Sequence, residues 1–183
     1  MSRFEYLSVL VSIVIALALS ELVQGWGALI RRRSDVRLYP LHLAWSVLVF
    51  LLMVQWWWGF WQYRAVESWR FITLIGFVSN AIGVALVAYV VSPGQPPEPD
   101  LRAHYWRQHR WLFGLAAAAI AELGLLGELL GRPTWSLENA FRAGGVAALG
   151  VLAWSRSERL HVALTLACYA LFLGFVAEAY RPL

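Results

Sequence analysis

The alternation of apolar runs and short polar segments along the chain predicts six hydrophobic helices. A helix needs roughly 20 apolar residues to cross about 30 Å of hydrocarbon, and five of the six runs approach that length. The run at 139 to 154 contains a shorter apolar stretch, AGGVAALGVLAW, which is typical of a short buried helix or of a re-entrant segment. We therefore expect an all-α, polytopic membrane helix bundle in a single domain, residues 1 to 183. The expected helices occupy residues 5 to 30, 41 to 63, 71 to 92, 111 to 131, 139 to 154 and 160 to 180.

Composition indicates that lipid is the solvent of this chain. Hydrophobic residues make up 60% of the sequence and charged residues 14%, a balance that a water-soluble globular domain does not have. The 15 basic residues are all arginines, against 11 acidic residues. In a membrane protein such an excess lies in loops beside anionic headgroups, so membrane lipid is an expected partner and nucleic acid is not.

Arginines in the predicted loops indicate an orientation. Nine of them follow the first, third and fifth apolar runs, and six lie on the other side of the membrane. Because positively charged loops tend to stay in the cytoplasm, this difference predicts that both ends of the chain face outward. The expected location is a bacterial inner membrane, which the chain crosses several times.

Tryptophans gather at the ends of the apolar runs. Indole rings are apolar in body and polar at one edge, so they favour the boundary between hydrocarbon and headgroups. Two interfacial belts are therefore predicted. The segment QWWWGFWQYR at 55 to 64 is assigned to one of them, with an aromatic cage for a cation or a sterol-like ligand as the alternative. One belt is expected to contain Trp26, Trp45, Trp106, Trp111 and Trp154, and the other Trp56, Trp57, Trp58, Trp61, Trp69 and Trp135.

Small and polar residues form stripes on several predicted helices. At 100° per residue, the first helix places Ser8, Ser12, Ile15 and Leu19 on one stripe. Small residues let helix backbones approach closely, so the equivalent faces of the third and fourth helices are predicted to be packing seams. These faces comprise Thr73, Gly76, Asn80 and Gly83 in the third helix, and Gly114, Ala118, Ala121, Gly124 and Glu128 in the fourth.

Polar side chains inside apolar runs are costly in lipid and usually face protein or water. A carboxylate there either takes a proton, binds a cation, or pairs with an arginine near a helix end, as Glu128 and Arg132 could do four residues apart. Histidines could ligate haem, but none forms a mid-span pair, so no cofactor is expected. The intramembrane polar candidates are Glu21, Asn80, Glu122, Glu128, His161 and Glu178.

Motifs for catalysis, metal binding and phosphate binding are missing from the sequence. The chain has no G-x-S-x-G, no H-E-x-x-H and no Walker loop, and the lone Cys168 belongs to no metal-ligand spacing. We therefore predict that the protein is not an enzyme and holds no metal.

The first helix resembles that of small prokaryotic potassium-permeable channels related to the lysosomal potassium channel. Their signature is Arg, three residues, then Phe-Ser-Asp, and the matching positions here are Arg3, Leu7, Ser8 and Val9. The similarity covers the first half of the chain and includes aromatic and polar residues at the end of the second helix. Val9 replaces the acidic residue of the signature. The resemblance implies six helices per subunit, a homo-oligomer, and a path for monovalent cations lined by the first helix.

Three functions follow from these features. The first is a small oligomeric channel lined by Ser8, Ser12, Ile15 and Leu19, in which hydroxyls replace ion hydration and apolar side chains gate by dewetting. The alternative is a non-conducting binding or accessory membrane protein whose polar stripes are packing seams. The third is a small transporter built on a weak inverted repeat, SELVQGWGALIR at 20 to 31 and AELGLLGELLGR at 121 to 132.

Overall fold

The computed structural model is all-helical, as predicted, and describes residues 3–66, 69–94 and 97–179. A short 3₁₀ helix, η1 (Trp61–Ala65), extends the second helix. The described residues form no β-strand, only one isolated bridge between Arg37 and Asp100. The helices are α1 (Arg3–Arg31), α2 (Pro40–Phe60), α3 (Phe71–Val91), α4 (Leu101–Leu129), α5 (Leu137–Trp154) and α6 (Glu158–Ala179).

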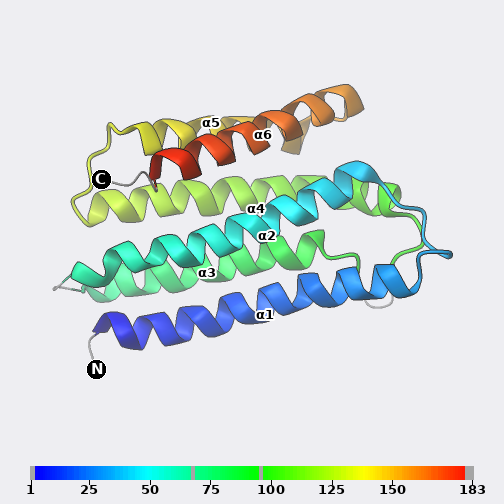
Figure 1. Cartoon of the computed structure of the whole chain (residues 1–183). Helices are drawn as coiled ribbons and strands as arrows, with labels where there is room; N and C mark the ends of the chain where they lie inside the picture. The colour runs from blue at the N-terminus through cyan, green and yellow to red at the C-terminus, as the bar shows by residue number, and fades with distance from the viewer. Residues whose placement is uncertain (1–2, 67–68, 95–96, 180–183) are drawn as a thin grey trace.

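The helices form two layers (Figure 1). In one layer α1, α3, α4 and α5 lie side by side in that order; α2 and α6 form the other. The helix α2 packs across α1, α3 and α4 and also contacts α6. We call the end of the bundle at which α1 begins and α6 ends the terminal end, and the opposite end, which holds the α3–α4 loop, the Asp100 end.

Five of the helices are long and apolar enough to cross a membrane, namely all except α5. The chain is thus compatible with the predicted multi-pass membrane protein. The helix α5 has 18 residues, which at 1.5 Å per residue gives a length of about 27 Å. It packs along α4 and α6 as one continuous helix. Residues 139 to 154 thus belong to one helix, Leu137–Trp154.

The fourth helix differs most from its predicted bounds. It begins at Leu101 rather than near residue 111. The Asp100 carboxylate caps its first turn by accepting hydrogen bonds from the backbone N–H groups of Arg102 and Ala103. Polar side chains in the first turns are buried at helical spacing, among them His104 and His109. Hydropathy did not reveal this part of the helix, because its buried face is aromatic and polar.

Tryptophan positions correct the predicted belts in part. Trp45 is only 1% exposed and donates to the Thr165 hydroxyl at 2.9 Å, while Trp56 is 7% exposed and also lies in the core. The belt assignment is therefore wrong for these two side chains, which hydrogen-bond between helices. It is also wrong for Trp69, which is 7% exposed and packs against Phe4 and Phe77. The exposed tryptophans, which fit the predicted belts, are Trp57, Trp58, Trp61, Trp111, Trp135 and Trp154.

The two predicted seams have different outcomes. On α3, Thr73 and Asn80 are buried, and a Cβ added at Gly76 would collide with Leu126 of α4. The α3 seam is thus confirmed. On α4, a Cβ at Gly114 or Gly124 would meet no neighbouring atom within 4 Å, and the residues Ala118, Ala121 and Glu128 of the same face are exposed. The α4 seam is wrong, because α4 packs through larger buried residues on its other faces.

Candidate functional site

An apolar cavity of about 330 Å³ lies between α2 with η1 on one side and α4, α5 and α6 on the other, and Phe77, Val84 and Val87 of α3 also line it. Its volume is near the lower limit of the roughly 300–1,000 Å³ that small-molecule sites occupy. The interior is lined by aromatic and aliphatic side chains. They include Trp45, Leu48, Phe113, Leu149, Cys168 and Phe172.

The cavity follows from how the four helices pack. Neighbouring helices pack around the ring α2, α4, α5 and α6, but within the described residues the backbones of α2 and α5 do not approach each other across it, and neither do those of α4 and α6. Side chains of α4 and α6 meet toward the Asp100 end, where Tyr105 and Phe113 contact His161. Small residues face the space that is left, including Ala116 and Ala119 of α4 and Gly145 of α5. A Cβ added at Gly145 would meet nothing within 4 Å. The centre of this ring therefore stays unfilled by protein.

Most of the polar side chains that line the cavity lie toward the terminal end, and Gln55 of α2 lies farther in. Gln62 and Arg64 come from η1, and Glu138 and Arg142 from the first turns of α5. The Arg142 guanidinium lies 3.2 Å from the Glu138 carboxylate and over the ring of Phe175, which also lines the cavity.

The cavity is open at this polar end. Trp58 and Trp61 line it and are also 61% and 62% exposed. Together with Gln62, Arg64, Glu138 and Arg142 they form what we call the mouth. A molecule that enters here would place an apolar part inside and a polar part among the arginines.

The stripe predicted to line a pore is partly enclosed in the chain's own core. Ile15 is 2% exposed, and Leu19 packs against the same core. The Ser12 hydroxyl accepts a hydrogen bond from the Trp57 indole at 3.1 Å, and the Ser8 hydroxyl donates to the Glu5 carbonyl oxygen at 2.8 Å. Within the described residues, the backbone of α1 approaches those of α2, α3 and η1 but not those of α4 or α6.

A polar network joins α2, α3 and α4 near the middle of the bundle. The Asn80 side chain, which is fully buried, accepts from the Trp56 indole at 2.8 Å and donates to the Ala119 carbonyl oxygen at 2.7 Å. It also donates to the Glu122 carboxyl at 3.2 Å, and Ser79 is hydrogen-bonded to the other oxygen of that carboxyl. Two of the predicted polar residues, Asn80 and Glu122, are therefore in direct contact.

The other predicted polar residues lie apart from this network. Glu21 accepts from the Ser92 hydroxyl at 2.8 Å, at the end of α3. Glu128 is exposed near the end of α4, and Glu178 is half-buried near the end of α6. His161 is buried and lies 2.6 Å from the Tyr105 hydroxyl. The structure therefore brings only Asn80 and Glu122 together among the six.

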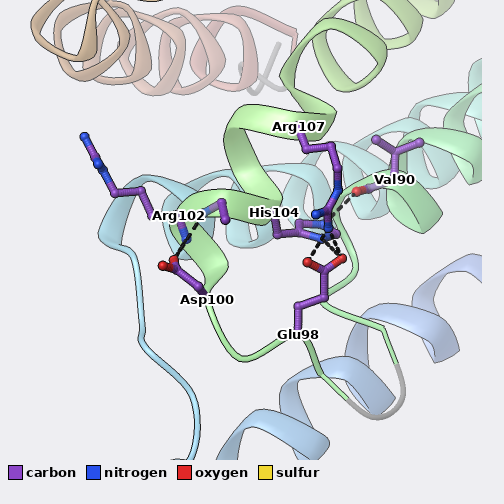
Figure 2. Close-up of polar contacts among 7 residues, drawn as sticks. Val90, Glu98, Asp100, Arg102, His104 and Arg107 are labelled. Atoms are coloured by element: carbon purple, nitrogen blue, oxygen red, sulfur yellow. Dashed lines mark hydrogen bonds and ion pairs between the residues drawn. The ribbon is translucent and has the colours of Figure 1, made fainter.

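The Asp100 end is closed by charged side chains of the α3–α4 loop (Figure 2). Figure 2 shows the His104 ring between the Glu98 carboxylate, at 2.9 Å, and the Val90 carbonyl oxygen, at 3.3 Å, with Arg107 on the same carboxylate. Partial burial raises the pKa of Glu98, but hydrogen bonds from His104 and Arg107 outweigh it, so this pKa lies below its ordinary value. The backbone N–H of Ala103 lowers the pKa of Asp100 in turn. These contacts tie the loop to α4.

Sequence reasoning missed the cavity. Its walls are ordinary apolar residues of five helices that are distant along the chain, so no local pattern marks them. The nearest signal was the glycine-rich start of the short run at 143 to 154, which we assigned by length alone. Its Gly145 lines the cavity. Among the described residues, no group of three His, Cys, Asp or Glu side chains is arranged to hold a metal ion.

No protein-family model, curated protein or solved structure matches this chain. The resemblance of the first helix to potassium-permeable channels therefore stays a prediction.

Proposed function

We propose that the protein is a non-conducting membrane protein that binds an amphipathic lipid with an anionic head and one hydrocarbon chain. The observation that carries this proposal is the cavity between α2, α4, α5 and α6, which is apolar inside and polar at one open end. Lipids surround a membrane helix bundle, so they are the molecules with ready access to this cavity. A protein can enclose a hydrocarbon chain only where it has an apolar space to receive it.

The interior supports the hydrocarbon part of the ligand. Cavity walls made of Leu48, Phe113 and Phe172 offer no hydrogen bonds, so a polar molecule would lose its hydration there without compensation. The Trp45 indole, which also lines the cavity, already donates its only hydrogen to Thr165.

The mouth supports an anionic head. Arg64 and Arg142 line it against one acidic residue, Glu138, which leaves one positive charge in excess. Arg132 lies 5.1 Å above the ring of Tyr63, another lining residue, and adds to the positive potential. A carboxylate or phosphate head would find guanidinium donors there, and guanidinium groups bind such anions in bidentate geometry.

The arginine distribution supports a bacterial inner membrane with the terminal end outside. In that orientation the mouth opens at the outer leaflet.

The channel hypothesis is the competing proposal and requires Ile15 to line a path between subunits. Its enclosure in the core of a single chain favours the binding protein. Purified protein in liposomes distinguishes the two, because a binding protein gives no potassium flux above that of empty vesicles. Flux that Ile15→Asn abolishes in a folded protein would favour the channel instead.

Quenching of tryptophan fluorescence tests the binding proposal. The probe is a fatty acid brominated in mid-chain, added to the protein in detergent micelles, because bromine quenches tryptophan on contact and Trp45, Trp56, Trp58 and Trp61 line the cavity. We expect saturable quenching. Quenching that keeps rising in proportion to the fatty acid concentration, without saturating, would contradict a defined site.

A pair of matched variants assigns the quenching to the cavity. Gly145→Leu fills the cavity without a backbone clash, whereas Gly150→Leu, also on α5 and also in open space, lies outside the lining. We expect only Gly145→Leu to abolish saturable quenching. A brominated alcohol and a brominated amine of the same chain length then test the head, and the fatty acid should bind tightest of the three. Tightest binding of the amine would overturn the anionic head.

A further inference from the structure

The hydrogen bonds around Glu122 fix the orientation of the Asn80 amide. Asn80 is oriented by its neighbours, because the Trp56 indole can only donate and the Ala119 carbonyl oxygen can only accept. Its oxygen therefore faces Trp56, and its two N–H groups face Ala119 and the Glu122 Oε2 atom. Oε2 is accordingly an acceptor.

The remaining oxygen of Glu122 faces Ser79. The Ser79 hydroxyl has one hydrogen but two neighbours, the Gly76 carbonyl oxygen at 3.0 Å and the Glu122 Oε1 atom. A carbonyl oxygen accepts only, so an ionised Glu122 would leave two acceptors competing for one hydrogen. Each contact has a hydrogen atom of its own when Glu122 carries a proton on Oε1 and donates it to Ser79, whereas an ionised Glu122 has to share the Ser79 hydrogen with Gly76.

No positive group substitutes for that proton among the described residues. The charged side chains of α5, which packs on α4, are Glu138 and Arg142, and these pair with each other. The helix α3 has no charged residue. Its one titratable side chain, Tyr89, lies near the Asp100 end of the helix, away from Glu122. Glu122 is half-buried and Ser79 is exposed, so the carboxyl lies at the bundle surface in the middle of the hydrophobic span. A bare carboxylate at this depth is costly in lipid.

We propose that Glu122, with Ser79 and Asn80, is an intramembrane proton-binding site accessible from the lipid between α3 and α4. This site is independent of the lipid cavity proposed above, since Glu122 does not line that cavity. Its ligand is the proton itself, and a monovalent cation is the alternative that the experiment must exclude.

Labelling with dicyclohexylcarbodiimide tests the site. This apolar reagent partitions into lipid and adds to a carboxylic acid, taking up the carboxyl proton as the new C–O bond forms, so it reports protonated acids. We expect mass spectrometry to find the adduct on Glu122, to a lesser extent on the exposed Glu128, and not on residue 122 of Glu122→Gln. Labelling of Glu122 should not change when sodium or potassium chloride is added at constant pH.

Two outcomes overturn the proposal. One is recovery of an unlabelled Glu122 peptide under conditions in which other carboxyls react. The other is protection of Glu122 by sodium or potassium at constant pH, which would make it a cation site.

An infrared measurement that needs no reagent provides the second test. The carbonyl band of a protonated carboxylic acid should be present in the native protein and lost in folded Glu122→Gln.

Discussion

The Trp56 indole donates to the Asn80 side-chain oxygen at 2.8 Å, and both residues are buried where α2 meets α3. The same indole ring lines the apolar cavity, and the same amide contacts Glu122. This one hydrogen bond therefore joins a residue of the cavity wall to the Glu122 network.

Loss of the Trp56 bond should destabilise the protein. Trp56→Phe keeps most of the apolar surface but leaves the buried Asn80 oxygen without its donor, so we expect a loss of about 1 kcal/mol in unfolding free energy. The measurement is unfolding in mixed micelles of a mild detergent and dodecyl sulfate.

Trp57→Phe is the matched control for this variant. Trp57 is 49% exposed and donates to Ser12 at the bundle surface, so its replacement should change stability by no more than about 0.5 kcal/mol. Equal losses in the two variants would mean that burial of the Asn80 bond is not what stabilises this region.

A second prediction concerns the contact between α1 and the α3–α4 loop. A Cβ at Gly25 would lie 2.7 Å from Cδ of Pro93 and 3.0 Å from the Ser92 hydroxyl oxygen. The proline ring cannot rotate away, so Gly25→Ala should cost about 1–3 kcal/mol. At Gly27 the nearest atom is the end of the flexible Arg31 side chain, at 3.3 Å. Gly27→Ala should instead be neutral or stabilise α1 by up to about 1 kcal/mol. Thermal unfolding in detergent compares the two directly.

The sequence predicted the helices well because the signal for a membrane helix is local. Run lengths and hydropathy alone locate α1, α3 and α6 to within a few residues. The start of α4 was missed because it depends on tertiary burial of its aromatic and histidine face. Trp45 and Trp56 were misassigned for the same reason, since an indole at a helix end looks interfacial until its hydrogen-bond partner on another helix is known.

The sequence predicted less well which polar residues meet and which residues of α1 are buried. Asn80 and Glu122 could each be recognised as unusual in lipid, but 42 residues separate them and only the packing of α3 on α4 brings them together. Ile15 was placed on a stripe with the serines, although the same periodicity also places it beside Val11 and Ala18, the buried face of α1. One sequence pattern fits both a pore and a core, so burial has to decide.

Acid should weaken the Asp100 end. The pKa values of Glu98 and Asp100 are both lowered in the folded protein. Their contribution to stability is therefore present above the carboxyl pKa of the unfolded chain and is lost as the pH falls through the folded values. We expect the melting temperature to fall with pH over this acidic range.

Asp100→Asn isolates the contribution of the cap. Asparagine caps a helix as well as aspartate but does not titrate, so the decline in acid should be shallower in this variant. Asp100→Ala should be less stable at every pH. Identical pH profiles for the native protein and Asp100→Asn would remove Asp100 from the explanation.

The buried pair of Tyr105 and His161 provides the last prediction. The His161 Nε2 atom lies 3.1 Å from the Ser155 carbonyl oxygen, which can only accept, so the ring hydrogen is on Nε2. The Nδ1 atom is then an acceptor, and the Tyr105 hydroxyl donates to it at 2.6 Å. Tyr105→Phe leaves this nitrogen buried without a donor, which should cost about 1–3 kcal/mol.

A double-mutant cycle checks that the loss comes from the unpaired nitrogen. His161→Leu removes the acceptor, so Tyr105→Phe introduced into that variant no longer strands a buried polar atom. We therefore expect the double variant to be more stable than the sum of the two single losses predicts, with a coupling of about 1 kcal/mol. Tyr169→Phe is the control, because the Tyr169 hydroxyl donates to the Ala44 carbonyl oxygen and not to His161. Its effect should be simply additive with His161→Leu, and a coupling as large as that of Tyr105 would contradict the assigned hydrogen bond.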